Sequence, residues 1–357
     1  MMNSAQVTVL IPLYNKAGEV ERAVRGVLAQ SEPNFSLVVI DDGSTDGSAD
    51  VVARIDDPRI RTVGQTNLGA SAARNRGLDE ARTELVAFLD ADDEWRPDFL
   101  TTVLALRTRH PEAGLWATGY ERVFDHGLRA ELPALIRVPQ SPEGGLIDDF
   151  FVSMEKDCPV CSSNILGSRG VFRETGGFPD KVELGEDWDT WIRIALKYPI
   201  AFSPGVQVRY HQDSSDRAMN RRRHSGEDTA MARTLRRALA DGAIGPAPRA
   251  SVASLFSQHL LFLARLRIMA GDGVRARKLI AEARSHCNCK AHWRRMWVES
   301  YLGPGVNTVL DAFRRFERSF RRRRRTRNSN AGYARNPRGQ KSEVRGQELI
   351  RRLDQGP

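Results

Sequence analysis

The sequence lacks an apolar run long enough to cross a membrane. The longest apolar stretch, 260–264 with its continuation to Met269, is interrupted by Arg265 and Arg267, whereas a spanning helix needs about 20 apolar residues in succession. The first residues, MMNSAQ, also lack the basic and apolar regions of a secretory signal. The sequence therefore predicts a cytoplasmic protein, with peripheral contact at the inner face of the cell membrane as its one membrane role to consider.

Cysteine is scarce, with four residues in a chain of 357. They form two close pairs, Cys158 with Cys161 and Cys287 with Cys289. The second pair is CxC rather than CxxC and lies more than a hundred residues after the first, which is atypical of a compact zinc site. We expect reduced thiols, as is usual in the cytosol, with zinc binding as the alternative.

The chain also lacks an evenly spread positive charge, although its formal net charge is +9. Residues 306–357 contain fifteen Lys and Arg against five Asp and Glu, a surplus of ten, so that the first 305 residues are about neutral. A basic tail favours an anionic surface as its partner, whereas nucleic acid in the main site would require a basic main domain.

Three short apolar runs predict buried parallel strands at residues 7–14, 35–42 and 85–90. The segments between them predict helices at residues 20–28, 44–55 and 69–81. This β-α-β-α-β order is typical of an α/β sheet. Ligands of such sheets bind at the carboxyl ends of the strands, where this chain carries polar residues at 12–15, 41–46 and 90–93.

Further along, Pro97 is well placed for the first turn of a helix, and residues 114–124 and 163–168 have strand character. Between 124 and 160 no clear pattern predicts an element. The spacing in 186–198 predicts a helix with one apolar face, formed by Trp188, Trp191, Ile192, Ala195 and Leu196. An extended stretch at 200–211 ends this domain.

The pattern beyond about residue 220 is helical, with segments at 250–270 and 274–283 joined by a Gly-Asp-Gly turn. This hairpin resembles one tetratricopeptide unit, but no second copy occurs, and such arrays need about three units. Residues 321–357 are rich in Arg, Asn and Gly with little apolar periodicity. We predict three parts: a main domain at 1–215, a helical region at 216–320 and a disordered basic tail at 321–357.

Several motifs resemble those of the family 2 glycosyltransferases in order and spacing. They are VTVLIPLYNKAGEVERAVRGVLAQ, FSLVVIDDGSTDGS, NLGASAARNRGL, LVAFLDADDEWRPD, and the later GGF with GEDWDTWIRIA. A single DxD is common by chance, but these motifs together span about residues 6–215 and fall where strand ends predict a ligand. The resemblance implies an α/β fold, the GT-A Rossmann-like nucleotide-diphospho-sugar transferase domain, here with a helical C-terminal appendage.

Asp90-Ala91-Asp92 matches the DxD motif of this family, which implies Mg²⁺ or Mn²⁺ as cofactor. Hard carboxylate oxygens suit these ions. The family pattern makes Asp92 the principal metal ligand and puts Asp90 nearer the ribose or a metal-bound water. His211 matches a late histidine that relatives often place near the metal or the diphosphate. A purely structural role of this histidine is the alternative.

The resemblance also implies a donor nucleotide site, which is assigned to Pro12, Tyr14, Asn15, Asp42, Asn67, Arg74, Asn75 and Asp90. Asp42 matches the family position whose carboxylate accepts a hydrogen bond from the imide N–H of uracil, which favours a uridine donor. Arg74 is the member of the set that brings positive charge toward the diphosphate. Ser44 and Asp46 are interpreted as turn and helix-capping residues.

Glu186-Asp187 matches the family's ED motif, in which the Asp is the catalytic base. Direct displacement needs a carboxylate beside the acceptor hydroxyl, and a single base without a protein nucleophile implies inversion. Glu186 and Asp189 are interpreted as first-turn acids that the helix dipole favours. The segment 158–164, CPVCSSN, lies where relatives shape the acceptor pocket, but its cysteines match nothing in the family, which leaves the acceptor open.

The predicted function is therefore an inverting glycosyltransferase. Its partners would be a nucleotide-sugar donor, with UDP-sugars favoured over GDP- and dTDP-sugars, and a saccharide or lipid-linked acceptor in cell-surface polysaccharide biosynthesis. A sugar-nucleotide nucleotidyltransferase is one rival, but such enzymes usually open with a Gly-rich phosphate loop and a Lys, where this chain has PLYNKAGE. Nucleic-acid binding through the basic tail is the other, and the neutral first 305 residues disfavour it.

Apolar residues at helical spacing precede the basic tail, at Val306, Val309, Leu310, Phe313, Phe316 and Phe320. Arginines flank this face, and the run 321–325 is entirely Arg. Such a basic amphipathic helix predicts peripheral contact of residues 306–325 with an anionic membrane. The alternative is a helix that packs its Phe face on the preceding helical segment.

Overall fold

The computed structural model describes residues 5–180, 182, 185–213, 229–242, 244, 248–286, 296, 300 and 301. These residues all belong to one compact unit, Met1–Tyr301. Its strands are β1 (Val7–Leu13), β2 (Phe35–Asp41), β3 (Ile60–Gly64), β4 (Leu85–Phe88), β5 (Glu94–Trp95), β6 (Leu115–Phe124), β7 (Arg129–Glu131), β8 (Gly145–Leu146), β9 (Ile165–Ser168) and β10 (Ile200–His211). Its α-helices are α1 (Val20–Leu28), α2 (Ser48–Ala53), α3 (Ala70–Glu80), α4 (Phe99–Arg109), α5 (Phe150–Ser153), α6 (Arg169–Thr175), α7 (Glu186–Ala195), α8 (Ala230–Asp241), α9 (Arg249–Met269) and α10 (Gly273–His286).

The described strands form one mixed sheet in the order β3-β2-β1-β4-β9-β6-β10-β5, with β7 beside β6 and β8 beside β10. Strands β3, β2, β1 and β4 are parallel, so their carboxyl ends meet at one edge of the sheet. Strand β9 runs antiparallel to both β4 and β6. The predicted α/β class is confirmed, and the polar segments that follow β1, β2 and β4 lie where such sheets bind ligands.

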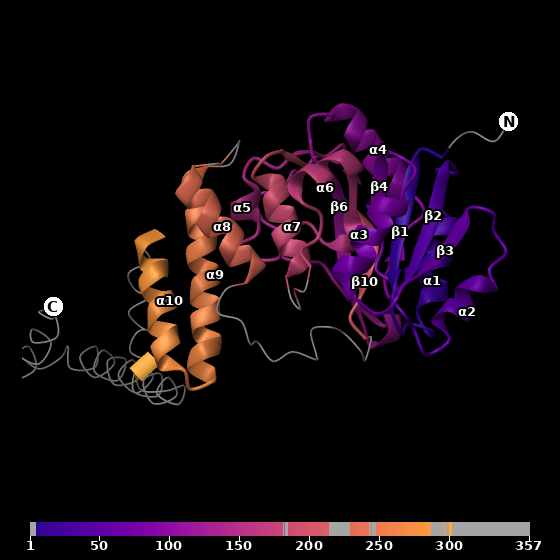
Figure 1. Ribbon diagram of the computed structural model, residues 1–357. Helices are drawn as coiled ribbons and strands as arrows, with labels where there is room; N and C mark the ends of the chain where they lie inside the picture. The colour runs from indigo at the N-terminus through magenta and orange to yellow at the C-terminus, as the bar shows by residue number, and fades with distance from the viewer. Residues whose placement is uncertain are drawn as a thin grey trace, which may run out of the picture. The chain divides into compact units, whose positions relative to one another are not determined.

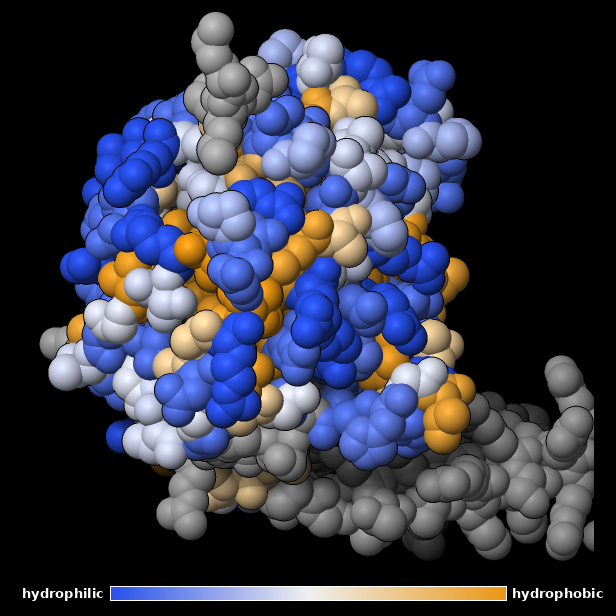
Figure 2. Space-filling view, turned by 90° about the vertical axis from the view of Figure 1, so that its right-hand side faces the viewer, coloured by the Kyte–Doolittle hydropathy of each residue, from blue (hydrophilic) through white to orange (hydrophobic). Residues whose placement is uncertain are grey.

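Strand β3 was not among the strands predicted from the sequence. This strand lies at the edge of the sheet, and its residues alternate between half-buried and exposed rather than forming an apolar run. Arg61 in β3 forms an ion pair with Glu80 of α3. Figure 2 shows the side of the molecule on which β2 and β3 lie in Figure 1, and hydrophilic side chains predominate there. Such polar cover protects an edge strand from pairing with other chains.

Several predicted element ends differ from the structure because local turns intervene. Strand β4 ends at Phe88, before the acidic turn. The helix expected at 44–55 begins only at Ser48, since Gly43 and Gly47 adopt positive φ and hold a turn ahead of it. Helix α4 begins at Phe99 with Asp98 at its N-cap, so Pro97 precedes the helix rather than occupying its first turn.

Two apolar clusters cover the faces of the sheet. One joins β1 and β2 to α1, α2 and α4, and the other joins the sheet to α3, α6 and α7. Gly77 lets α3 lie close to β1, because a Cβ there would come within 3.1 Å of Leu10 Cδ1. Four residues of the predicted apolar face of α7 are buried, namely Trp191, Ile192, Ala195 and Leu196. The fifth, Trp188, is 36 % exposed, and the buried part of this helix starts at the next residue, Asp189.

The cluster on the α7 face continues without a break into α8, α9 and α10. Helix α8 packs on α7, α9 packs on α5 and α8, and α10 packs on α9. The predicted helices at 250–270 and 274–283 thus correspond to α9 and α10. The predicted boundary at residue 215 and the predicted tail helix and basic tail beyond 305 lie outside the described residues. Within the described part, no helix is long and apolar enough to span a membrane.

Candidate functional site

The loops that follow β1 and β2 are bonded to each other through consecutive backbone amides. The N–H of Asn15 donates to Ser44 Oγ (3.1 Å), that of Lys16 to Ser48 Oγ (2.7 Å), and that of Ala17 to Asp46 Oδ2 (2.9 Å). In return, Asn15 Oδ1 accepts a bond from the N–H of Thr45 (2.8 Å). These bonds agree with the interpretation of Ser44 and Asp46 as turn residues, but neither caps α2, whose N-cap is Gly47 without a side-chain cap bond. They also fix the predicted donor-site residues Pro12, Tyr14 and Asn15 at the end of β1, where each is half-buried.

Asp42, at the end of β2, is buried and holds the loop before α3. Its carboxylate accepts hydrogen bonds from Gln65 Nε2 (2.7 Å), Leu68 N (2.9 Å) and Gly69 N (2.8 Å). Asn67, in the same loop, is exposed. A carboxylate has about four acceptor positions, so three internal donors leave room for one more.

Asp90 and Asp92 lie in the turn after β4, and each pairs with a different basic side chain. Asp90 Oδ1 accepts from Arg74 Nη2 (2.8 Å), and Asp92 Oδ2 pairs with Lys16 Nζ (2.8 Å). Arg22 Nη2 in addition donates to the main-chain oxygen of Asp92 (2.5 Å). The DxD turn is thereby fixed against the β1 loop, α1 and α3.

Asp93 and His211 connect this turn to the end of β10. The fully buried Asp93 accepts bonds from Ser163 Oγ (2.5 Å) and from the N–H of His211 (3.0 Å). Burial, with the charges of Asp92 and Asp90, raises the pKa of Asp93 well above its usual range. His211 Nε2 is buried without a hydrogen-bond partner, 3.6 Å from Glu94 Oε2. Burial and the Arg22 charge lower the pKa of His211, so its imidazole is neutral at pH 7.

These groups fit a divalent cation that substrate phosphates complete. Among the described residues, no three His, Cys, Asp or Glu side chains gather as a full protein cage. Mg²⁺ and its relatives, however, are usually bound through one or two carboxylates plus phosphates rather than by such a cage. The Asp92 carboxylate and the unused nitrogen of His211 are of the chemical type that such an ion requires.

Arg74 joins the DxD turn to the start of α7. Its guanidinium is 6 % exposed and donates to Asp90 Oδ1 and to Glu186 Oε1 (3.3 Å), beside the ring of Phe178. Burial lowers the pKa of Arg74, but the negative charges of Asp90 and Glu186 raise it by more, so that the net pKa is raised and the group stays protonated. The positive charge that the sequence assigned to the diphosphate is thus shared with two carboxylates.

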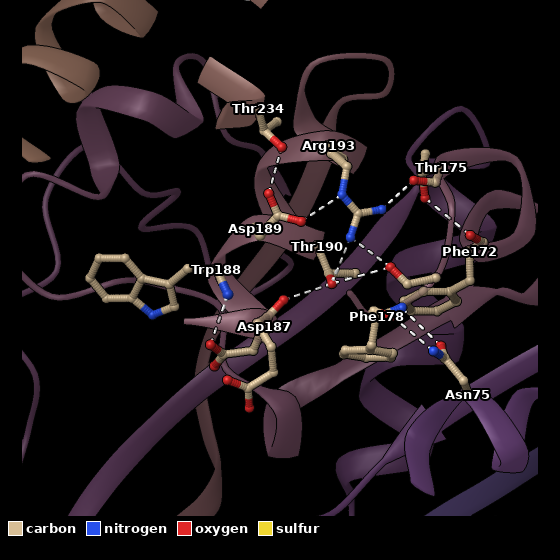
Figure 3. Close-up of polar contacts among 12 residues, drawn as sticks. Asn75, Phe172, Thr175, Phe178, Asp187, Trp188, Asp189, Thr190, Arg193 and Thr234 are labelled. Atoms are coloured by element: carbon tan, nitrogen blue, oxygen red, sulfur yellow. Dashed lines mark hydrogen bonds and ion pairs between the residues drawn. The ribbon is translucent and has the colours of Figure 1, made fainter. Parts of the chain in front are cut away.

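Asp187 stands in the first turn of α7, half-buried, with a perturbed carboxyl group. Burial, followed by the negative charge of Glu186, raises the pKa of Asp187 to about 7, against the opposing charge of Arg74. The N–H of Trp188 donates to Asp187 Oδ1 (2.8 Å), and the indole points away from the contacts on the other side of the helix (Figure 3). A carboxyl with a pKa near 7 is suited to accept a proton at neutral pH.

Helix α7 is held in place by a network around Arg193 (Figure 3). The guanidinium donates to Asp189 Oδ2 (2.8 Å), to the Gly177 carbonyl (2.6 Å) and to the Thr175 carbonyl. Asp189 Oδ1 in turn accepts from Thr234 Oγ1 of α8 (2.6 Å). Asp189 is an acid of the first turn, as the sequence predicted, and it is in addition buried and paired.

Asn75 differs in its contacts from the other predicted donor-site residues. Its Nδ2 donates to the Phe178 carbonyl (2.8 Å), and its Oδ1 accepts from the Phe178 N–H (2.9 Å). Both ends of the amide are thus used to fasten the turn before α7 to α3.

Sequence reasoning missed four residues that build this site. Lys16 follows Asn15 within the first motif, and Ser163 lies in the segment assigned to the acceptor pocket, so that their positions were available as signals. Arg193 occurs within the helical motif GEDWDTWIRIA but was given no role. Thr234 had no sequence signal, because it meets Asp189 only through the packing of α8 on α7.

The first cysteine pair lies beside the site as free thiols. Cys158 is buried and Cys161 half-buried. Burial raises the pKa of Cys158 to about 12 and that of Cys161 well above its usual value. Both groups are therefore protonated at neutral pH. Cys287 and Cys289 lie outside the described residues.

Comparison with known sequences matches residues 8–176 to the model of the glycosyl transferase family 2. An uncharacterised glycosyltransferase of Rickettsia conorii is 31 % identical over 203 residues, which are 56 % of this chain and 32 % of the relative. The putative teichuronic acid biosynthesis glycosyltransferase TuaG of Bacillus subtilis is 37 % identical over 138 residues, or 38 % of this chain and 54 % of the relative.

The succinoglycan biosynthesis protein ExoW of Rhizobium meliloti is 38 % identical over 149 residues, or 39 % of this chain and 47 % of the relative. The chain thus spans between a third and about half of the length of these curated relatives. Among solved structures, Staphylococcus aureus TarS 1–349 in complex with UDP-GlcNAc has a TM-score of 0.66 at 16 % identity, over 87 % of this chain and 92 % of TarS 1–349. The shared architecture confirms the predicted GT-A type fold with helices after it.

Proposed function

We propose, from the premise that residues 8–176 form a family 2 glycosyltransferase domain, that this chain is an inverting glycosyltransferase. It would transfer a sugar from a nucleotide diphosphate to a hydroxyl of a saccharide or a lipid-linked glycan. The observation that carries the proposal is the joining of the DxD turn to the ED helix by Arg74. The buried guanidinium of Arg74 holds the carboxylate of Asp90, on the donor side, next to the helix that carries the proposed base Asp187.

In the proposed reaction, Asp187 accepts the proton of the acceptor hydroxyl while the hydroxyl oxygen bonds to the anomeric carbon. The bond from that carbon to the diphosphate oxygen breaks, and the diphosphate leaves with the electron pair. Attack from the face opposite the leaving group inverts the configuration, so an α-linked donor gives a β product. The bond from the Trp188 N–H orients the Asp187 carboxylate for this role.

Mg²⁺ or Mn²⁺, held by Asp92 with His211 as a further ligand, would supply electrostatic stabilisation of the charge on the leaving diphosphate. Arg74 contributes positive charge from the protein to the same region. Asp90 would lie nearer the ribose, and Asn67 and Asn75 near the nucleotide, although the amide of Asn75 already binds Phe178. Pro12, Tyr14 and Asn15 would line the nucleotide pocket.

A uridine donor is proposed from Asp42, whose carboxylate has one acceptor position left for the imide N–H of uracil. The UDP-GlcNAc complex of TarS is consistent with a UDP-sugar in this fold. For the acceptor, the exposed ring of Trp188 beside Asp187 offers a flat apolar surface of the kind on which sugar rings stack. The names of TuaG and ExoW, relatives in polysaccharide biosynthesis, point to the same class.

The test is donor turnover by the full chain. Incubation with UDP-, GDP- and dTDP-sugars in the presence of Mn²⁺ is expected to release UDP from a UDP-sugar, and EDTA is expected to stop the release. A nucleotidyltransferase would instead consume a nucleoside triphosphate and a sugar phosphate with release of pyrophosphate. Failure of every nucleotide sugar to bind or react would overturn the proposal.

The proposal also assigns a part to each region of the chain. We assign catalysis to residues 1–215, with residues 216–320 as a helical region and 321–357 as a tail. Residues 306–325 would bring the enzyme to an anionic membrane on the cytoplasmic side, where a lipid-linked acceptor would reside. Nucleic acid is not proposed as a partner.

A further inference from the structure

We infer that the Lys16 ammonium opposes binding of a metal ion at Asp92 and thereby makes this binding depend on the nucleotide diphosphate. The inference rests on the proposed function for the identity of the donor. Its geometric basis is the ion pair between Lys16 Nζ and Asp92 Oδ2, at 2.8 Å, with side chains 13 % and 18 % exposed.

The position of Lys16 is fixed independently of this ion pair. Its N–H donates to Ser48 Oγ, and the amides on either side are bonded to Ser44 and Asp46. The main chain of Asp92 is held equally firmly, by the guanidinium of Arg22 on its carbonyl oxygen. The backbones that carry the ammonium and the carboxylate are therefore both held in place, and forming the pair requires ordering of the side chains alone.

The Lys16 ammonium pairs with Asp92 Oδ2 and compensates the charge of that carboxylate. A cation that binds Asp92 must either take the place of the ammonium or bind the other oxygen a few ångströms from it, where like charges repel. In both cases Lys16 opposes binding of the cation alone.

A nucleotide diphosphate removes this opposition because it brings negative charge for both cations. Its phosphate oxygens would supply ligands for a metal held by Asp92 and acceptors for the Lys16 ammonium. Lys16 thereby weakens binding of the metal alone and strengthens binding of the metal with the donor. Metal and donor then bind cooperatively, and by linkage each raises the affinity of the other equally.

The experiment measures Mn²⁺ binding to the full chain by electron paramagnetic resonance of free Mn²⁺, first without nucleotide and then with UDP. A charge-assisted bond is worth about 1.5–3 kcal/mol, so Lys16→Met is expected to tighten Mn²⁺ binding without nucleotide by about tenfold or more. The same variant should weaken UDP binding in the presence of Mn²⁺ by a comparable factor. Lys16→Gln keeps a polar contact to Asp92 without the charge, and should shift both affinities in the same directions if Lys16→Met folds poorly.

Lys197→Met is the matched control, since Lys197 forms an exposed ion pair with Glu174 outside the site, and it should bind Mn²⁺ as the unmodified chain does. Mn²⁺ affinity without nucleotide that is unchanged or weaker in both folded Lys16 variants would overturn the inference. Because this titration needs no sugar transfer, its failure is separate from that of the proposed function. A chain that turns over UDP-sugars, yet shows no Lys16 effect, refutes only the role of Lys16 in metal binding.

Discussion

At the residue scale, the acidic side chains of this site differ mainly in their surroundings. Asp92 pairs with Lys16 and Asp90 with Arg74, whereas Asp93 is fully buried and accepts hydrogen bonds from Ser163 Oγ and the His211 N–H. Asp187 lies between these extremes, half-buried next to Glu186 with Arg74 nearby. Burial and neighbours thus give these four aspartates different charge environments, which is consistent with the different roles proposed for them.

Replacement of Asp187 by Asn tests the base directly. The amide keeps the size of the side chain and an oxygen for the Trp188 N–H, but it cannot take a proton. We expect transfer to fall by about 10²–10⁴-fold, the usual contribution of a general base, with UDP affinity nearly unchanged. Glu174→Gln, on an exposed ion pair away from the site, serves as the control. A parallel loss of UDP binding in calorimetry would show that Asp187 is structural.

The pH dependence of transfer follows from the raised pKa of Asp187. Only the deprotonated carboxylate can act as a base, so the rate should fall as the pH drops through about 7, and level off above it. The slope below the pKa should approach tenfold per pH unit. The stability of the fold changes in the opposite direction. The pKa of Asp187 is 3.8 in the unfolded chain and about 7 in the folded chain, so the folded chain binds the proton more tightly. The free energy of unfolding should therefore decrease as the pH rises from about 4 to about 7.

Asp187→Asn removes this ionisation and should therefore unfold at a higher temperature than the unmodified chain at pH 8. Rate profiles and thermal unfolding at pH 5–9 measure both effects. A rate that is flat across pH 6–8, with no difference in unfolding at pH 8, contradicts the assignment.

At the element scale, helix α7 owes its position to contacts from three directions. Arg74 and Asn75 reach it or its preceding turn from α3, Arg193 fastens it to the 175–177 turn, and Thr234 reaches it from α8. The ED motif is therefore presented to the donor side by a helix that other elements hold at its start and along its length.

Replacement of Asn75 by Ala separates a structural role from nucleotide binding. The Phe178 N–H and carbonyl would both lose their partner, and each buried group left unsatisfied costs about 1–3 kcal/mol. We expect a lower free energy of unfolding in urea, and Asn75→Asp should lose stability as well, because its second oxygen would face the Phe178 carbonyl without a hydrogen to donate. If the alanine variant instead kept its stability and lost UDP affinity, Asn75 would be a direct nucleotide contact.

At the scale of the whole molecule, the described helices after β10 belong to the same apolar cluster as the face of the sheet under α7. The bond from Thr234 to Asp189 and that from Ser251 to Asp149 link these helices to the domain with polar contacts as well. Helices α8, α9 and α10 thus support the face of the domain that carries α7.

The basic segment 306–325 lies outside the described residues, and its proposed membrane contact is tested in solution. Each basic residue near an anionic bilayer contributes about 1 kcal/mol, so the full chain should sediment with anionic vesicles at low salt and be released by high salt. A chain that ends at Gly305 should stay in the supernatant, and neutral vesicles are the control. Equal sedimentation of both chains, or of neither, would assign the Phe face to protein packing.

The sequence by itself determined the order of the main elements and the strand ends at which the candidate site is proposed. Apolar runs ending in polar residues identified β1, β2 and β4, because buried parallel strands need apolar side chains along their length and leave polar groups at their ends. The same motifs identified Asp92 and Asp187 as candidates. Strand β3 was not predicted, because an edge strand with one solvated face carries no continuous apolar run.

The tertiary structure decided which groups face which. No local pattern brings Lys16 to Asp92, Arg74 to Glu186 or Thr234 to Asp189, since these pairs are separated by 76, 112 and 45 residues. It also decided that Asn75 binds a backbone turn, and that Asp187 is half-buried with a pKa near 7. Spacing along the chain fixes the type of a side chain and the element that carries it, but its charge environment and partners depend on packing between distant segments.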